Sequence, residues 1–445
     1  MQNQTDVVPS QIVPMVQQAE KYLSAREYQK ALDLYDLCLA VAPDNAHLRY
    51  CVASLYSELY KSGIAISILR SVVKELPDHA QAWNNLGIAY KNAGQWDSAH
   101  EAYSKALELN YEPLTIVNMS GLYVNNGTPQ EAIRWAEKGL KLAPAVPQLH
   151  NHRALGFLEL GKWEEGFKMY DGRFGLPGWH NRKYSGPMWK GEHVKRLLIH
   201  GEQGLGDEIL FMAALDRVRP RVDEIVIECA ERLVPVFEAS FNLPCYATEA
   251  QVKEKEHWDA WIPMGSLFNV VGFDEHKTKY LKVSKPYLKT DKFRIGISFR
   301  GGTIQTHEHL RNFPIEWWEQ LFTHEAEFIS IQYGPAAGMA KKMGLPHDEA
   351  SIQDAQALVG MIASCDLVIS VCNTSVHMAG GLGIPCWCLT PYKVAWRYGM
   401  TGEKMLFYES VTCIRQGKDE SWQSVIQRAK VKLEDSGIRE RKKAA

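Results

Sequence analysis

The 445-residue sequence has little of what would bring a protein to a membrane or to nucleic acid. No stretch approaches the roughly 20 uninterrupted apolar residues that a membrane-spanning helix needs. The formal net charge is −2, so there is no global basic field to attract nucleic acid or an anionic membrane. The N-terminus, MQNQTDVVPSQ, lacks the basic-then-apolar profile of a secretory signal. We therefore expect a cytoplasmic protein with no membrane span and no nucleic-acid partner.

Metal-binding patterns are also missing from the sequence. The nine cysteines are scattered without the spacing of a metal cluster, and no Asp-x-Asp motif is visible. His307 and His309 have no Cys or carboxylate at metal-ligand spacing nearby, so surface loop histidines are expected. We predict free thiols in a reducing compartment, no metal and no cofactor.

A repeat of 33 to 34 residues occupies the first part of the chain. Its alanines are followed twelve residues later by a proline or, once, a tyrosine, at Ala31/Pro43, Ala65/Pro77, Ala99/Tyr111 and Ala132/Pro144. The third unit adds Trp83, Leu86, Gly87, Tyr90, Tyr103 and Ala106. This pattern resembles the tetratricopeptide repeat (TPR), a helix pair in which small residues allow close helix crossing. With a degenerate fifth unit at Gly166 and Tyr170, the pattern predicts an all-α TPR solenoid of about five helix pairs over residues 1–170.

Three asparagines share one position of the repeat. Asn84, Asn118 and Asn151 each occupy the fifth position of the first helix of a pair, on the face that normally lines the concave groove. They could form a ladder that grips the backbone of a protein or peptide acceptor, like a ladder known in the O-GlcNAc transferase family. The alternative is that they are solvated polar positions.

After residue 170 the pattern changes. Residues 171–195 combine Gly, Pro and Trp and predict an ordered connector pinned by aromatic side chains. Short apolar runs then alternate with helical stretches, a pattern typical of parallel sheets covered by helices. The runs form two groups, which predict two Rossmann-like lobes over residues 196–288 and 289–445, with ligands at the carboxyl ends of their strands.

A glycine-rich turn, Gly201-Glu-Gln-Gly-Leu-Gly-Asp-Glu208, follows the first strand of the first lobe and opens a helix. Gly204 and Gly206 allow a tight turn and a close approach of the backbone to a ligand. Asp207 at the helix start could act as general base for an incoming hydroxyl. The alternative is that Asp207 only caps the helix, because Asp is a favoured capping residue.

A second turn lies in the second lobe, where an apolar strand runs into Asn373, Thr374 and Ser375 and then into a helix of small residues. The free amides of that helix start, with two hydroxyls, predict a site for a phosphate or diphosphate. His377, in the first turn, could donate to the phosphate or could be a structural histidine. Arg300 and Arg311 are candidates to neutralise a diphosphate leaving group.

Several segments together resemble bacterial TPR proteins with a heptosyltransferase-like C-terminal domain, which belongs to the nucleotide-sugar glycosyltransferases of GT-B fold related to glycosyltransferase family 9. The segments are PMWKGE, LLIHGEQGLGDEILF, RNFP, FISIQ, DLVISVCNTSVHMAGGLGIPCWCLTP, WRYG and FYES, and they extend the resemblance over essentially the whole chain. The resemblance implies an inverting, metal-independent transfer from a nucleotide-sugar to an acceptor hydroxyl. The TPR array would then recruit a protein acceptor.

The resemblance also implies roles for individual residues. Asp207 matches the acidic residue that heptosyltransferases use as base, and the turn of residues 373–375 matches the turn that holds the donor phosphate. Arg311 falls where the family carries a basic residue toward the diphosphate. Gln332 and Tyr333 fall near where such enzymes hold the nucleobase.

The sequence departs from the family at two points. Members commonly have an Asp-Thr pair where this chain has Cys372-Asn373-Thr374, and the first lobe is short, at about 90 residues. These differences keep a second hypothesis open, in which the chain is a non-catalytic TPR adaptor whose GT-B domain binds nucleotide-sugar or is vestigial.

Overall fold

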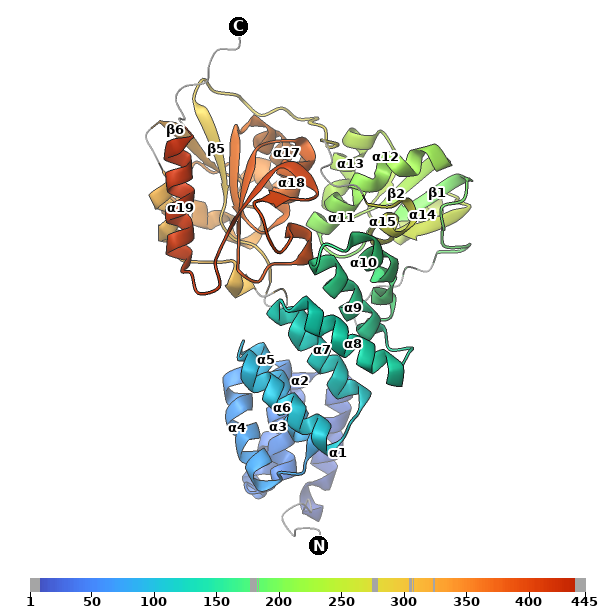
Figure 1. Cartoon of the computed structure of the whole chain (residues 1–445), viewed down its shortest axis with the longest axis vertical. Coiled ribbons are helices and arrows are strands. Elements are labelled where there is room, and N and C mark those ends of the chain that lie inside the picture. Colours follow the sequence, from blue (N-terminus) through green and yellow to red (C-terminus); the bar gives the residue numbers. More distant parts are fainter. Residues whose placement is uncertain are drawn as a thin grey trace. The chain divides into compact units, whose positions relative to one another are not determined.

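The computed structural model describes residues 9–176, 182, 184–273, 279–303, 306, 308–322 and 325–436 (Figure 1). The chain divides into two compact units, Met1–Gly156 and Phe157–Ala445. The boundary falls inside one helix, so the second helix of the fifth predicted pair belongs to the second unit. No helix in the described part of the chain is long and apolar enough to cross a membrane.

The first unit is a succession of antiparallel helix pairs, as the repeat predicts. A short 3-10 turn comes first, and the helices then follow one another along the chain, joined by connections of a few residues. Their bounds are α1 Val13–Ser24, α2 Tyr28–Val41, α3 Ala46–Glu58, α4 Ser62–Glu75, α5 Ala80–Asn92, α6 Trp96–Leu109, α7 Pro113–Asn126, α8 Pro129–Leu142 and α9 Pro147–Glu159.

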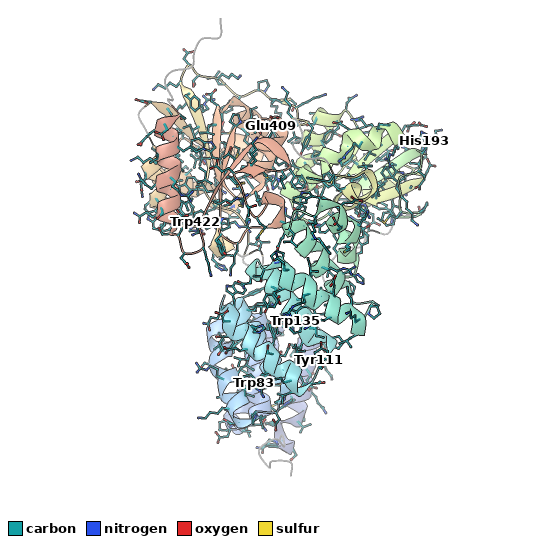
Figure 2. The ribbon with its side chains drawn as sticks, in the orientation of Figure 1. Trp83, Tyr111, Trp135, His193, Glu409 and Trp422 are labelled. Atoms are coloured by element: carbon teal, nitrogen blue, oxygen red, sulfur yellow. The ribbon has the colours of Figure 1, made fainter. Side chains whose placement is uncertain are left out.

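The repeat residues lie where helices meet. The alanines at positions 31, 65, 99 and 132 are completely buried in the second helix of each pair. A Cβ on Gly87 would lie 2.5 Å from the ring of Tyr103, so only glycine lets α5 and α6 pack this closely. The indole of Trp83, labelled in Figure 2, donates to the carbonyl of Pro77 at 2.8 Å and ties α5 to the turn before it.

A left-handed residue closes the first helix of each pair. Gly94, Gly127 and Gly161 have positive φ, and Tyr60 and Arg26 take the same conformation (φ 58° and 59°) one and two periods before Gly94. The tight reversal between the two helices requires this backbone geometry, which glycine adopts without strain and other residues adopt at a cost. The reversal therefore recurs with the period of the sequence.

The second unit contains two sheets. The first has the order β3-β2-β1-β4 and all its neighbouring strands are parallel. Together with helices α11 to α15 it forms what we call the N-lobe. Its elements are β1 Val194–His200, α11 Leu205–Phe211, α12 Leu215–Val218, β2 Val222–Glu228, α13 Val234–Phe241, β3 Cys245–Tyr246, α14 Glu249–Lys255, β4 Ala260–Pro263 and α15 Leu267–Val271.

The second sheet has the order β6-β5-β7-β8-β10-β9, parallel except for β9 at one edge. With helices α16 to α19 it forms the C-lobe. Its elements are β5 Phe293–Ser298, β6 Ala326–Ser330, α16 Glu349–Gln353, α17 Ala355–Ser364, β7 Leu367–Val371, α18 Thr374–Leu382, β8 Cys386–Thr390, β9 Lys404–Met405, β10 Tyr408–Arg415 and α19 Trp422–Asp435.

Two α/β lobes with strands alternating with helices are therefore present, as the sequence predicts. The apolar runs that predict strands coincide with β1, β2, β4, β5, β6, β7 and β8; they are residues 196–200, 224–228, 260–263, 294–299, 327–332, 367–371 and 386–389. The short β3 and β9 and the longer β10 are absent from that prediction. In β10, polar residues at positions 409, 410 and 412 interrupt the apolar run, and pairing with β8 rather than local pattern makes it a strand.

Helix α10 (Trp163–Met169) packs into the second unit through an aromatic cluster. Phe167 contacts Phe268 and Phe273 beside the N-lobe helix α15, with ring centroids 4.9 and 5.7 Å apart. It also contacts Trp396 of the C-lobe at 5.8 Å, and Trp163 contacts the same residue at 6.2 Å. The second helix of the fifth predicted pair thus contacts both lobes.

Candidate active site at the strand ends

The glycine-rich turn leads directly from β1 into α11. Gly204 is the N-cap of α11 and Asp207 is its third residue, where its carboxylate accepts from the backbone N–H of Gly204 at 3.4 Å. Asp207 therefore supports the helix start from position N3, not from the N-cap that the sequence offered as the alternative. Its other carboxylate oxygen forms an ion pair with the guanidinium of Arg397, and both side chains are 19% exposed.

Arg397 lies in a 3-10 turn, Trp396–Tyr398, after β8 of the C-lobe. The ion pair with Asp207 thus joins the two lobes across 190 positions of sequence. Burial lowers the pKa of the Arg397 guanidinium, but Asp207, Tyr170 and Tyr398 together raise it above the usual value. The role of Arg397 was missed from sequence, where only the segment WRYG that contains it was noted.

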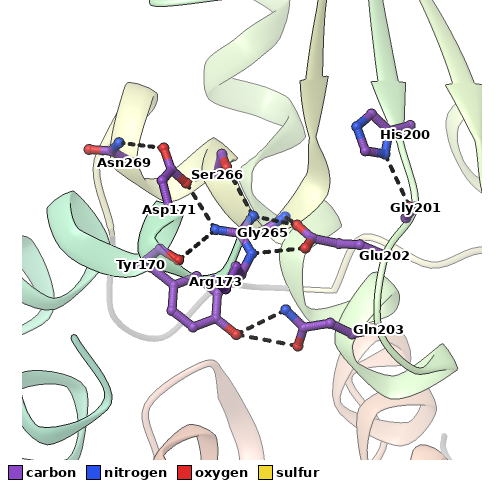
Figure 3. A network of polar contacts seen from close by, with 10 residues as sticks. All are labelled: Tyr170, Asp171, Arg173, His200, Gly201, Glu202, Gln203, Gly265, Ser266 and Asn269. Carbon is purple, nitrogen blue, oxygen red and sulfur yellow. Dashed lines mark hydrogen bonds and ion pairs between the residues drawn. The ribbon is translucent and has the colours of Figure 1, made fainter. Parts of the chain in front are cut away.

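Two further residues of the same turn have structural partners (Figure 3). Glu202 forms a bidentate pair with Arg173, with N···O distances of 2.6 and 2.8 Å, and accepts from the backbone N–H of Gly265 at 2.6 Å. Gln203 exchanges hydrogen bonds with the hydroxyl of Tyr170 at 3.0 and 3.3 Å. Both partners belong to the segment after α10, so this part of the motif anchors the connector to the N-lobe.

Arg173 is the centre of that anchor. It is 2% exposed and also donates to the carbonyl of Tyr170, to Asp171 and to Ser266, each at 2.9 Å. Burial would lower the pKa of the guanidinium, yet the charge of Glu202 keeps it above the usual value. Glycine is required at position 265, because a Cβ there would lie 2.5 Å from the Glu202 carboxylate.

Glu208 directs its carboxylate into the N-lobe, where it accepts from the backbone N–H of Ala230 at 2.9 Å. The residue is 4% exposed. Burial raises the pKa of Glu208 to about 8, although the Ala230 hydrogen bond acts in the opposite direction. A buried carboxyl beside Asp207 carries no separate signal in the sequence, where it appears as one more charged residue of the turn.

The second predicted turn is closed by its own hydrogen bonds. Asn373 is the N-cap of α18, and its carbonyl oxygen accepts from the N–H of Ser375 at 2.9 Å and from Ser370 at 3.0 Å. Its amide nitrogen donates to Ser298 at 2.7 Å and to the carbonyl of Arg300 at 3.0 Å. The N–H of Thr374 donates to the hydroxyl of Tyr333 at 3.2 Å. A phosphate at this helix start would have to displace the Tyr333 hydroxyl.

His377 is placed differently from the expected phosphate donor. Its two ring nitrogens lie 3.3 Å from the hydroxyl of Tyr408 and 3.2 Å from that of Tyr398, and the residue is 2% exposed. Burial, with the charge of Arg397, lowers its pKa to about 3, so the ring is neutral. Its carbon edge faces Gly206, where a Cβ would lie 2.8 Å away. In this structure His377 is a structural histidine between the lobes.

Gln332 is also engaged internally. Its side-chain oxygen accepts from the backbone N–H groups of Phe299 and Arg300 at 2.8 and 2.9 Å, and its amide donates to the carbonyl of Tyr333 at 3.0 Å. The side chain thereby closes the end of β5 rather than presenting a free amide to a nucleobase. Tyr333 lies under the guanidinium of Arg232 from the N-lobe, 5.5 Å from the ring centroid.

Arg311 reaches the same strand ends. It donates to the carbonyl of Cys372 at 3.1 Å and to that of Thr306 at 2.8 Å. Arg300 is half-buried directly after β5, and Gly301 beside it packs against Asn373. His309 lies in the short turn Glu308–Leu310, and His307 lies outside the described residues. Within the described ranges no group of three or more His, Cys, Asp or Glu could hold a metal ion.

The two predicted turns therefore meet. Asp207 and Gly206 of the N-lobe contact Arg397 and His377 of the C-lobe. The lobes also meet at a second place, lined by residues that include Leu205, Arg232, Tyr333 and Thr374, where the gap between them has no room for a water molecule. Direct contacts join the lobes nearby, such as Gln356 donating to the carbonyl of Pro235 at 2.8 Å.

In the first unit, two of the three predicted groove asparagines bind each other. The amide of Asn118 donates to the side-chain oxygen of Asn84 at 2.9 Å, and Asn84 is 5% exposed. The chain of amides continues through Asn85 to Ser54 at 3.3 and 2.7 Å. Asn151 on α9 is half-buried. Their role in holding an acceptor stays a prediction.

Comparisons with known proteins point mainly to the repeats. The tetratricopeptide repeat family matches residues 80–110, which cover α5 and α6. Protein FlbA of Caulobacter vibrioides is 22% identical, with the alignment covering 92% of this chain and 82% of FlbA. The BBSome complex member BBS4 of Bos taurus is 27% identical over 32% of this chain, which spans only 27% of BBS4.

Heat shock protein STI1 of Saccharomyces cerevisiae is 33% identical over 21% of this chain and 16% of its own length. The crystal structure of MamA covers 35% of this chain and 91% of that protein, with 21% identity and a TM-score of 0.31. The family match falls on the most complete unit of a period that continues through successive helix pairs. The N-terminal helices of this chain are a tetratricopeptide-repeat array.

Proposed function

We propose that the chain transfers a sugar from a nucleotide-sugar donor to an acceptor hydroxyl through a GT-B-type pair of lobes. The observation that carries the proposal is that the glycine-rich turn of the N-lobe meets the C-lobe at the first turn of α18, where Gly206 packs against His377. Asp207 of the same turn forms an ion pair with Arg397, whose neighbour Tyr398 lies 3.2 Å from His377. In two-lobed parallel folds, ligands bind at the carboxyl ends of the strands. A carboxylate base and a cationic anion site would thus face each other.

The proposed reaction inverts the anomeric centre. The acceptor oxygen bonds to the anomeric carbon as the bond from that carbon to the donor diphosphate breaks, and the nucleoside diphosphate leaves with the bonding electrons. Asp207 takes the proton of the acceptor hydroxyl. Arg300 and Arg311, with the first amides of α18, would stabilise the charge on the leaving diphosphate. This arrangement needs no divalent ion.

The TPR array would supply the acceptor. Repeat arrays present extended concave surfaces that suit protein or peptide segments. Asn151 and the side-chain oxygen of Asn118 would contact such a segment, while Asn84 holds the amide nitrogen of Asn118. The proposed acceptor is therefore a protein.

A non-catalytic adaptor is the second candidate, and the closed strand ends favour it. Asn373, Gln332 and His377 all have internal partners. The gap between the lobes at Leu205, Arg232, Tyr333 and Thr374 has no room for a water molecule, whereas typical ligand pockets have volumes of roughly 300–1,000 Å³. Nucleotide-sugar transfer therefore requires the lobes to separate when the donor enters.

A binding panel tests the proposal. Thermal unfolding would be measured with UDP, GDP, ADP and CMP, each alone and as common sugar conjugates, because a ligand of the native state raises its stability. We expect one nucleotide class to raise the melting temperature and its sugar conjugate to label a co-expressed protein. A flat panel would favour the adaptor.

Asp207→Asn tests the chemistry. Loss of the base should abolish transfer, by a factor of about 100 or more, while the nucleotide still binds. Equal transfer by the wild type and the variant would remove Asp207 from the mechanism.

A further inference from the structure

The Asp207–Arg397 pair occupies the place where the proposed reaction needs a free carboxylate. Both side chains are largely buried, and each belongs to a different lobe. The carboxylate oxygen of Asp207 that is paired with the Arg397 guanidinium is not available to an acceptor hydroxyl at the same time. The structure therefore shows the proposed base in a masked state.

Arg397 has capacity for a second partner. Its Nε–H is buried and has no hydrogen-bond acceptor among the residues that the structure describes, and the same is true of Arg311. Buried donors without acceptors are costly, and the oxygens of a bound anion would supply acceptors to both of these Nε–H groups. Arg415 differs, because its side chain donates to the carbonyls of Tyr398, Gly399 and Gly402.

Arg311 reaches the end of β7, where it donates to the carbonyl of Cys372 at 3.1 Å. Burial alone would raise the pKa of the Cys372 thiol, but a hydrogen bond with Cys388 and the charges of Arg311, Arg415 and Arg397 lower it. A ligand with oxygens on two linked centres, such as a diphosphate, matches two guanidiniums with open donors better than a single carboxylate does.

The side chain of Arg397 is held in place by a buried aromatic residue next to it in the sequence. Its guanidinium lies over the ring of Trp396, 5.2 Å from the centroid. Trp396 is 4% exposed and packs against Trp163, Phe167 and Phe407 with centroids 5.8 to 6.2 Å apart. A guanidinium held by a buried aromatic surface can exchange one anionic partner for another with little movement of its own backbone.

We propose that the Asp207–Arg397 pair is a donor-operated charge switch, in which the diphosphate of the nucleotide-sugar takes Arg397 and releases the Asp207 carboxylate. The inference rests on the proposed function and adds to it the order of the steps. Donor binding precedes activation of the acceptor hydroxyl. Without donor, the Asp207 carboxylate stays paired with Arg397 and does not take a proton from an acceptor hydroxyl.

The switch predicts that the anion and Asp207 compete for Arg397. Binding of inorganic diphosphate, and of the nucleoside diphosphate selected by the panel above, would be measured calorimetrically without divalent ions. Asp207→Asn should bind diphosphate about 3- to 10-fold more tightly than the wild type, because Arg397 is no longer occupied. In an Arg397→Met background, Asp207→Asn should bring no such gain.

Two controls keep the comparison specific. Glu403→Gln removes one exposed carboxylate of the C-lobe, whose side chain is 78% exposed, and should leave diphosphate binding unchanged. Arg397→Lys keeps the charge but loses the fork of donors, and should bind diphosphate more weakly than the wild type. Thermal unfolding of each variant establishes that it is folded.

Each other outcome overturns the inference in a recognisable way. Equal binding by the wild type and Asp207→Asn would show that Arg397 is not shared. If Asp207→Asn still tightens diphosphate binding in the Arg397→Met background, the tighter binding comes from the loss of general repulsion by the Asp207 charge and not from the release of Arg397. A nucleotide that binds while diphosphate binds no variant would leave the proposed function standing and refute the switch. A panel without any bound nucleotide would refute the proposed function itself.

Discussion

The two units of the chain are stabilised over very different sequence separations. In the TPR array each helix packs on its neighbours in sequence, and the polar side-chain pairs are often short-range and exposed, such as Arg134 with Glu131 one turn away. In the second unit β5 pairs with β7, and buried ion pairs join Arg173 to Glu202 and Asp207 to Arg397. Local periodicity therefore specifies the first unit, whereas distant partners specify the second.

The largest expected effect tests the buried anchor of the second unit. Arg173→Met leaves the Glu202 carboxylate buried without its cation, which should cost about 3–5 kcal/mol of unfolding free energy. Hydrogen exchange read by peptide should show lost protection in β1 to β4 and none in α3 to α6. The matched control Arg134→Met breaks an exposed pair and should cost less than about 1 kcal/mol. Similar costs for both would contradict the contrast between the units.

The second prediction concerns close packing against a distant segment. A Cβ on Gly360 of α17 would collide with the backbone carbonyl of Lys285, which cannot move as a flexible side chain would. Gly360→Ala should therefore destabilise the second unit by about 2–3 kcal/mol, measured by denaturant unfolding. Gly338→Ala, with nothing within 4 Å of its Cβ, is the control and should be nearly neutral. Equal unfolding free energies of the two variants would show that the backbone at Lys285 moves to make room for the added Cβ.

The third prediction uses pH. Because burial raises the pKa of Glu208 to about 8 in the folded protein, the folded state holds more protons than the unfolded state between about pH 4.5 and 8. The stability from this group is present below pH 4.5 and is lost as pH rises through 8. Glu208→Gln keeps an acceptor for Ala230 and should remove at least about 1 kcal/mol of this loss between pH 5 and 7. Parallel stability profiles of wild type and variant over this range would contradict the assignment.

The smallest effects are expected in the repeats. Gly63 lies in α4 with nothing within 4 Å of its Cβ, so Gly63→Ala should stabilise the array by about 0.5 kcal/mol. Gly94 has φ of +72°, so Gly94→Ala should destabilise it by about 1 kcal/mol. Hydrogen exchange of α4 to α6 measures both. A gain in stability for Gly63→Ala and a loss for Gly94→Ala would support the conclusion that local backbone geometry governs this unit. Effects of the same sign would contradict it.

Much of the architecture was accessible from the sequence. The period of 34 residues predicted the helix pairs and their buried alanines, because each repeat unit buries the same face against its neighbours. Alternating apolar runs predicted most strands of both lobes. The strand β10 was missed, because polar residues interrupt its apolar run. Its pairing with β8, which the sequence does not show, makes it a strand. Propensity is a weak guide wherever tertiary pairing decides a strand.

The candidate site was less accessible. Sequence placed Asp207 at a helix start and Asn373 before another, and both positions are as expected. It could not show that His377 lies between Tyr398 and Tyr408, nor that Gln332 closes the end of β5. A polar residue at a strand end looks the same in sequence whether it faces a ligand or a neighbouring backbone.

The sequence by itself determined the repeat array, the alternation of strands and helices, and the two turns at which polar residues follow buried strands. These are local properties, because helix period, turn conformation and burial of small residues repeat along the chain. Only the tertiary structure decided the partners: Arg173 for Glu202, and Arg397 for Asp207. The physical reason is that a buried charge is stabilised by whichever opposite charge the fold brings to it, and that neighbour can come from anywhere in the sequence.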